Sequence, residues 1–433
     1  MGDPDATRYL FSLQGRGMKF GLRNISSLLH FAGNPQKQFP SVHIAGTNGK
    51  GSSSSFFASI AMEAGYKTGL YTSPHLVSFS ERIRVNGHPI PDDRLSRYVR
   101  YFKPAIDRVG ATFFEATTCI AFQYFADEEV ELAVIEAGLG GRLDATNVLH
   151  PVVTIITCIS LDHTDILGKS VRAIAAEKAG ILKSGVPCVT GVTNSAVLKV
   201  LSLKAQKQHT SLYQSHEVLK MEVLRDVEQA VRVRLYGKRL RVPGVLLGLR
   251  GIHQSLNAHV VSAALEVLLR SRHPAVVRVN SRSLKRGLQR VVANTGLRGR
   301  LERIGLDGKV LIDVAHNPDA IETLVTTLRQ DGAGPFIVVF GVMKDKDYRS
   351  MIKALKSVAG MFVTVQPATP RALPEPMLRK EIRRQGVLVR RGGTVKAGLR
   401  LAKGLSKKEQ KILVVGSHFV AGEALAFLET DRT

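Results

Sequence analysis

The chain has 433 residues, of which 44% are hydrophobic, and this is enough for two domains that each bury their own core. No stretch approaches the roughly twenty apolar residues of a membrane span, and residues 1–20 lack the basic head, apolar core and cleavage site of an export signal. The three cysteines are odd in number and widely separated, which excludes a disulfide or metal framework. We therefore expect a cytoplasmic protein.

The 61 Lys and Arg exceed the 36 Asp and Glu and give a net charge of +25, which would attract nucleic acid, nucleotides or polyanionic substrates. The excess is concentrated in residues 271–310, with ten basic and two acidic residues, and in residues 371–413, with thirteen and three. Solvated faces of a basic protein would have the same composition. Since no aromatic residues are interleaved for stacking on bases, we do not expect nucleic acid to be the main partner.

Short apolar runs alternate with helix-length amphipathic stretches from the start, which is typical of an α/β fold built on a largely parallel, wound sheet. Residues 211–248 instead alternate polar and apolar positions, notably at 222–235 and 239–242, and this predicts a small antiparallel part. The predicted strands, each followed by a glycine-containing loop and a helical pattern, are residues 41–45, 132–136, 152–159 and 186–189.

A second winding begins after the basic segment 294–300, which contains Gly296 and Gly299. We therefore expect an N-terminal domain at 1–295 and a smaller, Rossmann-like C-terminal domain at 299–433. The strands predicted for the second domain are residues 310–314, 336–340, 361–365 and 412–415.

The first predicted strand runs directly into Gly46-Thr47-Asn48-Gly49-Lys50-Gly51-Ser52 and then into a helical pattern. Backbone amides of such a loop, together with the helix N-terminus, form an anion site, so the segment predicts a P-loop that binds nucleotide phosphates. Lys50 would reach the terminal phosphates and Ser52 would ligate magnesium. The spacing differs from the usual G-x-x-x-x-G-K-[ST], and a plain glycine-rich turn remains open on this pattern alone.

Polar groups also follow two further predicted strands. Glu136 ends the strand at 132–136 and opens the loop 136–147, while the next strand is followed by Asp162 and His163. Because ligands collect at the carboxyl edge of a wound sheet, Glu136 and His163 are candidate magnesium ligands. The alternative is a solvated carboxylate and a structural histidine.

These segments resemble those of folylpolyglutamate synthases and dihydrofolate synthases, which belong to the Mur ligase superfamily. The resemblance spans nearly the whole chain. It rests on HIAGTNGKGS at 43–52, YTSPHL at 71–76, EAGLGGRLDATN at 136–147, LDHTDILG at 161–168, EKAGI at 177–181, GIHQ at 251–254 and DVAHNP at 313–318. It implies an ATP-dependent ligase that adds glutamate to a folate or dihydropteroate carboxylate through an acyl phosphate.

The resemblance also implies an ATP site with two magnesium ions. The catalytic candidates are Lys50, His316 and Lys178, the last of which family members carry as a carbamate. The residues implied for ATP are Gly46, Thr47, Asn48, Gly49, Lys50, Gly51, Ser52, Gln254, Asn257, Arg300 and Asp313. Those implied for magnesium are Ser52, Ser73, Glu136 and His163.

Phe114, Asp144 and Ala145 match family positions that hold folate or dihydropteroate, while His316 and Ser417 match positions near the incoming glutamate. The chain departs from the family pattern around the second domain. It reads Leu297-Arg298-Gly299-Arg300 where relatives often have Trp-Pro-Gly-Arg, it has Val314 where many have glycine, and residues 416–419 follow the family's ending only loosely.

Three other functions remain open from the sequence. A Mur-type ligase with a different carboxylate acceptor would use the same ATP core, and a simple P-loop phosphotransferase would form no amide bond. A nucleic-acid-binding module would explain only the charge. We expect small-molecule substrates, no membrane partner and a monomer.

Overall fold

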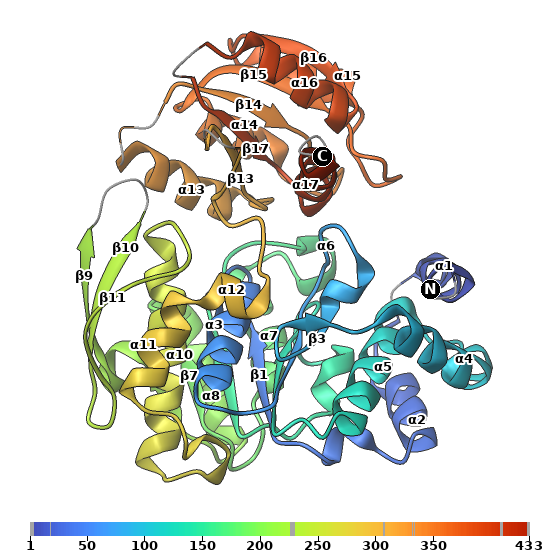
Figure 1. Cartoon of the computed structure of the whole chain (residues 1–433), viewed down its shortest axis with the longest axis vertical. Coiled ribbons are helices and arrows are strands. Elements are labelled where there is room, and N and C mark those ends of the chain that lie inside the picture. Colours follow the sequence, from blue (N-terminus) through green and yellow to red (C-terminus); the bar gives the residue numbers. More distant parts are fainter. Residues whose placement is uncertain are drawn as a thin grey trace.

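The computed structural model describes residues 4–17, 19–225, 230–305, 308–330, 332, 334–407 and 410–430. An eight-stranded sheet forms the centre of the larger part of the molecule (Figure 1). In sheet order its strands are β4 (His88–Pro89), β3 (Ile83–Val85), β2 (Thr68–Tyr71), β5 (Leu132–Glu136), β1 (Ser41–Ala45), β6 (Val153–Ile156), β7 (Cys188–Thr190) and β8 (Leu212–Gln214).

Six neighbouring strands of this sheet, from β2 to β8, run parallel, and β3 and β4 are antiparallel additions at one edge. The central strands are apolar throughout because both faces are buried. In β5, Leu132 and Val134 face one core while Ala133 and Ile135 face the other. The predicted wound parallel sheet is therefore confirmed.

Helices cover both faces of the sheet (Figure 1). One core lies against α3 (Lys50–Glu63), α10 (His253–Arg270) and α11 (Ser281–Gln289). The opposite cores lie against α1 (Pro4–Ser12), α2 (Arg23–Phe31), α4 (Asp92–Val109), α5 (Phe113–Asp127), α7 (Val171–Lys178) and α8 (Ser195–Lys207). Shorter helices are α6 (Thr164–Leu167), α9 (Ser215–Val218) and α12 (Val291–Thr295).

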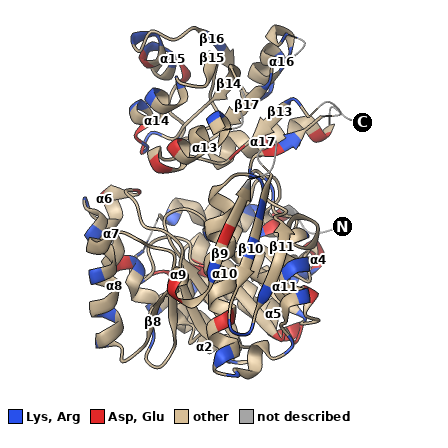
Figure 2. Ribbon diagram, turned by 90° about the vertical axis from the view of Figure 1, so that its left-hand side faces the viewer, with Lys and Arg blue, Asp and Glu red and all other residues tan. Residues whose placement is uncertain are grey.

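The predicted antiparallel part is a three-stranded sheet of β9 (Lys220–Arg225), β10 (Val231–Tyr236) and β11 (Arg241–Leu246). Alternate residues of β10 enter the core, whereas Arg232 and Arg234 face outward, and Figure 2 shows basic residues along these strands. This antiparallel part begins later than residue 211, where it was predicted to begin, because residues 212–214 join the main sheet in parallel. Within the stretch predicted at 222–235, residues 226–229 lie outside the described part of the chain.

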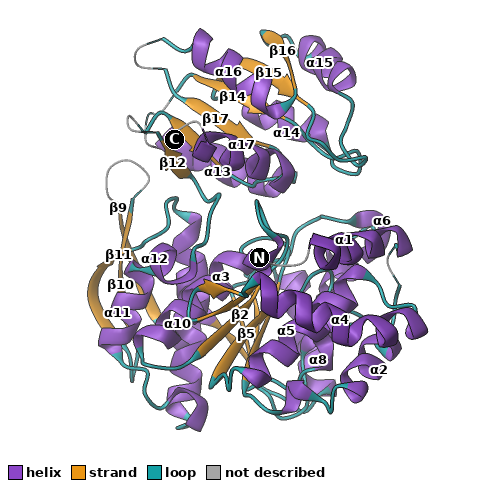
Figure 3. Ribbon diagram, turned by 45° about the vertical axis from the view of Figure 1, so that its right-hand side comes forward, coloured by secondary structure: helices purple, strands orange, loops and turns teal. Residues whose placement is uncertain are grey.

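A separate six-stranded sheet carries helices on both faces (Figure 3). Its strands, in sheet order, are β12 (Glu302–Ile304), β13 (Val310–Ile312), β17 (Ile412–Val415), β14 (Phe336–Phe340), β15 (Ala359–Val365) and β16 (Val389–Gly393), with β12 alone antiparallel. Its helices are α13 (Pro318–Gln330), α14 (Tyr348–Leu355), α15 (Glu375–Arg384), α16 (Val395–Leu405) and α17 (His418–Thr430). We call β12–β17 with α13–α17 the C-terminal unit, and the preceding elements the N-terminal unit.

The strand predicted at 152–159 ends early, at Ile156. The chain then turns toward the segment after β1, because the Thr157 hydroxyl donates to the Asn48 carbonyl at 2.6 Å and the Cys158 carbonyl accepts the Thr47 amide at 2.8 Å. The residues that follow β6 therefore hold the predicted phosphate loop in place through these two hydrogen bonds. Across the described residues, no helix is long and apolar enough to cross a membrane.

Candidate active site

The loop between β1 and α3 lies at the carboxyl edge of the main sheet. Gly49 has a left-handed backbone with φ of 81°, and a Cβ there would overlap the side-chain oxygen of Asn257. α3 begins at Lys50, whose ammonium donates to the Gly46 and Thr47 carbonyls at 3.2 Å each. Ser52 is buried in the first turn, where backbone amides have no carbonyl partner within the helix. The local geometry fits an anion-binding loop.

Glu136 ends β5 beside β1 and is 4% exposed. Its carboxylate accepts the backbone amide of Ser73 at 3.1 Å. Burial raises the pKa of Glu136, while the charge of Lys50, the Ser73 amide and the charge of Arg300 act in the opposite direction. A Cβ placed on Gly51 would lie 3.2 Å from the Arg300 guanidinium and 3.6 Å from the Glu136 carboxylate. Four separate chain segments therefore meet at the start of α3.

Lys178 is the last residue of α7, and its side chain contacts the loop between β1 and α3. Its ammonium is buried and donates to the Gly46 carbonyl at 2.8 Å. Burial, and then the charge of Lys50, lower the pKa of Lys178 to about 7. A large fraction of this amine is therefore neutral at neutral pH, which is the form that reacts with carbon dioxide to give a carbamate.

The segment after β6 places Asp162 and His163 at the same edge. Burial and the neighbouring Lys346 lower the pKa of His163 to about 4, so that its imidazole is neutral at neutral pH. Burial alone would raise the pKa of Asp162, but the His316 imidazole 3.7 Å away and the charge of Lys346 hold it well below its usual range. A neutral imidazole and an ionised carboxylate can both coordinate a cation.

Gln254 and Asn257 lie in the first turns of α10 and are buried. The Asn257 amide donates to the Gln254 side-chain oxygen at 2.9 Å, and Gly49 packs against Asn257. These two predicted ATP-side residues therefore adjoin the loop directly.

Arg300 and Asp313 come from the entry to the C-terminal unit. The Asp313 carboxylate accepts the backbone amides of Leu301 at 2.9 Å and Ala315 at 2.8 Å, which fixes the chain on either side of β13. Burial lowers the pKa of Arg300, opposed by the charges of Asp313 and Glu136. Asp313 thus holds the segment that delivers Arg300 to Gly51.

His316 and Ser417 follow β13 and β17, which are neighbouring strands. The His316 ring lies 4.9 Å from the ring of His418, and its Nδ1 is 2.9 Å from the Val314 carbonyl. The Ser417 hydroxyl accepts the Val420 amide at 3.1 Å and is 2% exposed. His316 reaches the Asp162 edge, whereas the Ser417 hydroxyl bonds to its own helix.

Ala145 belongs to the core that also contains Ala133 and Ile135 of β5, Phe114 packs against that core, and Asp144 directly precedes Ala145. The Phe114 ring is 6.0 Å from that of Tyr71 and packs on Gly138, where a Cβ would overlap it. The Asp144 carboxylate is buried and accepts the amides of Leu139 at 2.7 Å and Thr146. Burial raises the pKa of Asp144, opposed by these hydrogen bonds. Asp144 therefore shapes the loop around the buried Ala145.

Two groups that sequence reasoning missed also lie here. Arg82 is 8% exposed, donates to the His75 ring at 2.8 Å, and lies 5.2 Å from the centre of the Phe113 ring. Lys346 crosses from the C-terminal unit to Asp162 at 2.6 Å. The polar run Lys344 to Asp347 follows the apolar strand β14, which marks Lys346 as a candidate residue at the carboxyl edge of the second sheet but does not predict its contact with Asp162.

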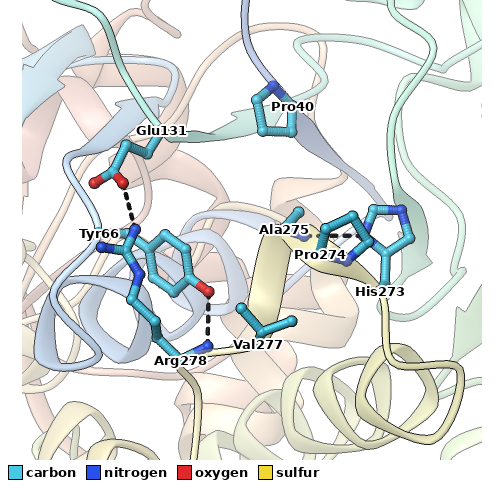
Figure 4. A pocket seen from close by; sticks show the side chains of 8 residues that line it. All are labelled: Pro40, Tyr66, Glu131, His273, Pro274, Ala275, Val277 and Arg278. Atoms are coloured by element: carbon cyan, nitrogen blue, oxygen red, sulfur yellow. Dashed lines mark hydrogen bonds and ion pairs between the residues drawn. The ribbon is translucent and has the colours of Figure 1, made fainter.

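A cavity of about 430 Å³ lies elsewhere, at the amino end of the strands (Figure 4). Pro40 and Glu131 precede β1 and β5, and Arg278 stacks on the Tyr66 ring at 3.7 Å while its guanidinium bonds to Glu131. The polar groups that line the cavity therefore bond to one another. The cavity lies at the end of the strands opposite to the phosphate loop. Across the described ranges, no three His, Cys, Asp or Glu side chains gather into a metal-binding group.

The sequence matches the Mur ligase middle domain over residues 44–265 and the Mur ligase glutamate ligase domain over residues 299–418. It is 37% identical over 367 residues to the dihydrofolate synthase/folylpolyglutamate synthase of Bacillus subtilis, covering 82% of this chain and 83% of the relative. A structure of Mycobacterium tuberculosis folylpolyglutamate synthase complexed with ADP and AMPPCP has a TM-score of 0.86 and 32% identity, covering 94% of this chain and 95% of that one. Escherichia coli FolC in complex with DHPP and ADP has a TM-score of 0.87 and 27% identity, covering 99% and 98%.

Proposed function

Because the chain belongs to the folylpolyglutamate synthase and dihydrofolate synthase family of Mur ligases, we propose that it uses ATP to join L-glutamate to a folate or dihydropteroate carboxylate. The observation that carries the proposal is the meeting of Lys50, Glu136, Lys178 and Arg300 around the first turn of α3. A structural glycine-rich turn has no need to gather two cationic groups around a buried amine and a buried carboxylate.

The residues at this edge fit a hard divalent cation. Glu136 offers a buried carboxylate that accepts the Ser73 backbone amide, and Ser52 directly follows Gly51, which adjoins that carboxylate. With few protein ligands, a magnesium ion would take its other ligands from phosphate oxygens and water, as is usual for nucleotide sites. We therefore assign Ser52 as a ligand of one magnesium ion, and Ser73, Glu136 and His163 as ligands of a second. Bound magnesium would supply positive charge to the triphosphate during transfer.

The first chemical step activates the acceptor. An oxygen of its carboxylate attacks the γ-phosphorus, the bond to the β–γ bridging oxygen breaks, and ADP leaves with that electron pair. Lys50 and Arg300 lie where positive charge stabilises the transferring phosphoryl group. Asn257 and Gln254 hold the adenine side, and Asp313 fixes the segment that presents Arg300. The loop amides of residues 46–52 bind the phosphates.

The second step forms the amide bond. The glutamate amine attacks the acyl carbon of the acyl phosphate, phosphate leaves with the bonding pair, and the amine loses a proton. His316 and Ser417 lie on the C-terminal unit and are assigned to the glutamate. Because water would hydrolyse the acyl phosphate, residues 1–295 and 299–433 act as two domains that close over it.

Lys178 is assigned as a carbamate-bearing residue. Its amine has the low pKa that carbamate formation requires, and the modified group would present a carboxylate at Gly46. On the acceptor side, the Phe114 ring and the loop at Asp144 and Ala145 form the assigned folate or dihydropteroate site. We further propose a cytoplasmic monomer whose partners are small molecules and not nucleic acid.

Mass spectrometry of products tests the function. Purified protein is incubated with ATP, magnesium and glutamate, separately with dihydropteroate and with a reduced folate monoglutamate. Addition of one glutamate with one ADP per amide bond is the expected result, and the acceptor that reacts distinguishes the two synthase activities. ATP binding without an adduct on either acceptor would instead favour a Mur-type ligase with another acceptor.

A further inference from the structure

Asp162 is the centre of a polar contact between the two units. Its side chain is 8% exposed, and its carboxylate accepts the Lys346 ammonium at 2.6 Å on one oxygen and the Asn317 amide at 3.0 Å on the other. The backbone amide of His163 also donates to it at 2.9 Å. Asp162 belongs to the N-terminal unit, while Lys346 and Asn317 belong to the C-terminal unit.

Lys346 is buried as deeply as its partner, with a side chain that is 6% exposed. Its Nζ also lies 3.4 Å from Nε2 of His163. When both groups of an ion pair are buried, removing one of them strongly destabilises the arrangement that buries the other, because the remaining charge has no compensation. A pair exposed to solvent would contribute little. The burial of both groups therefore makes this contact dependent on the two units being together.

The contact extends to the phosphate loop itself. The Asn48 amide donates to the Asn317 side-chain oxygen at 3.3 Å and to the Asp319 carboxylate at 2.8 Å, and the Ser160 hydroxyl donates to Asp319 at 3.2 Å. Asn317 and Asp319 flank the start of α13. One connected network thus joins the loop, the Asp162 edge and the C-terminal unit.

We propose that the Asp162–Lys346 ion pair is the positioning contact that fixes the C-terminal unit over the phosphate loop during ligation, an inference that rests on the proposed function. Lys346 acts through Asp162 and does not touch the reacting atoms. With the pair formed, His316 lies within 3.7 Å of Asp162, and the segment from 313 to 319 is held against the loop. Without the ion pair, the network loses the Asp162–Lys346 contact. Among the described residues of this network, it is the one ion pair in which both side chains are less than a tenth exposed.

Double-mutant kinetics test the proposal. Asp162→Asn, Lys346→Met and the double variant are assayed for kcat and KM. Each single variant should lower kcat by about tenfold or more, and the double variant should fall no further than the worse single one, because paired residues lose the same interaction once. Lys344→Met, which removes a lysine bonded to Pro370 within the C-terminal unit, and Asp165→Asn, an exposed neighbour, should stay within about twofold of the wild type.

Small-angle scattering with ADP and a non-transferable ATP analogue gives a readout that does not depend on turnover. The wild type should be compact, and both single variants should have a larger radius of gyration at an unchanged unfolding temperature. Single variants as active as the wild type, or losses that multiply in the double variant, would overturn the pair as a positioning contact. A wild type that forms no glutamyl product would overturn the proposed function instead, and the scattering would still report on the pair.

Discussion

Replacing Lys178 with methionine removes a buried amine from beneath the phosphate loop, and we expect the variant to be more stable but to lose ligation. The pKa of Lys178 falls from 10.5 to about 7 on folding because the side chain is buried and lies near Lys50. The unfolded chain keeps the ordinary pKa and binds a proton more tightly than the folded chain does. Protonation therefore favours unfolding.

The size of this effect depends on pH. The destabilisation is complete below the folded pKa of about 7, declines as pH rises toward the unfolded value of 10.5, and vanishes above it. It amounts to about 4 kcal/mol at pH 7 and about 2 kcal/mol near pH 9. Methionine also removes the hydrogen bond to Gly46, which offsets about 1 kcal/mol. The variant should thus gain about 3 kcal/mol at pH 7 and about 1 kcal/mol near pH 9.

Urea unfolding followed by circular dichroism measures the difference, in buffers freed of carbon dioxide so that the amine stays unmodified. Lys183→Met is the matched control. Lys183 also donates to a carbonyl, that of Asn147 at 2.7 Å, but it is only partly buried and should change stability less. A stability difference that is the same at every pH, or a Lys178→Met variant less stable than the wild type, would refute the reasoning.

Carbon dioxide gives a second measurement on the same residue. The neutral amine adds carbon dioxide and releases a proton, so bicarbonate should restore turnover to depleted wild-type enzyme. At a fixed concentration of dissolved carbon dioxide, restoration should be slower at pH 6 than at pH 8, because about a tenth of the amine is neutral at the lower pH and about nine-tenths at the higher. Lys178→Met should show no response to bicarbonate.

Lys50→Ala and His163→Ala should each abolish glutamate ligation, measured by mass spectrometry, with an unchanged unfolding temperature, and full turnover in either variant would remove its assignment. Gly49→Ala should weaken nucleotide binding by about tenfold or more in calorimetry, because its Cβ would overlap Asn257 and its φ of 81° is strained for alanine. Glu266→Gln should destabilise the fold by about 2–4 kcal/mol in urea without changing KM, because its fully buried carboxylate holds three backbone amides of the β10–β11 turn and the Arg270 guanidinium. An equally stable Glu266→Gln variant would contradict that account.

The strands that the sequence predicted well are those buried on both faces. β1, β5, β14 and β17 read as unbroken apolar runs, and their predicted bounds agree with the structure. β16 was missed because its sequence, Val-Arg-Arg-Gly-Gly, has a single apolar residue, and its position depends on pairing with β15. Local pattern cannot predict a strand whose stability comes from its neighbour.

Part of the candidate site could be predicted from the sequence because of the same strand pattern. Residues that follow parallel strands must share one edge of the sheet, so Lys50, Glu136 and His163 could be grouped from the strand pattern alone. The contacts that cross between the two units could not be. Lys346 is 184 positions from Asp162, and its burial depends on how the two units pack against each other. No periodicity or spacing encodes that packing.

The buried ionisable groups of the site are costly for the fold. Burial favours the uncharged forms of Glu136 and Arg300, so both groups resist the charges that their chemistry requires. Burial also disfavours the charged form of Lys178, which costs the fold stability while that amine is protonated. A core selected for stability alone would replace such groups with apolar side chains of similar volume. Their presence around Gly46 and Gly51 is explained if nucleotide phosphates and cations supply the missing compensation when they bind. Ligand binding should therefore stabilise this unit by more than contact area alone would give, and Lys178→Met should reduce that gain.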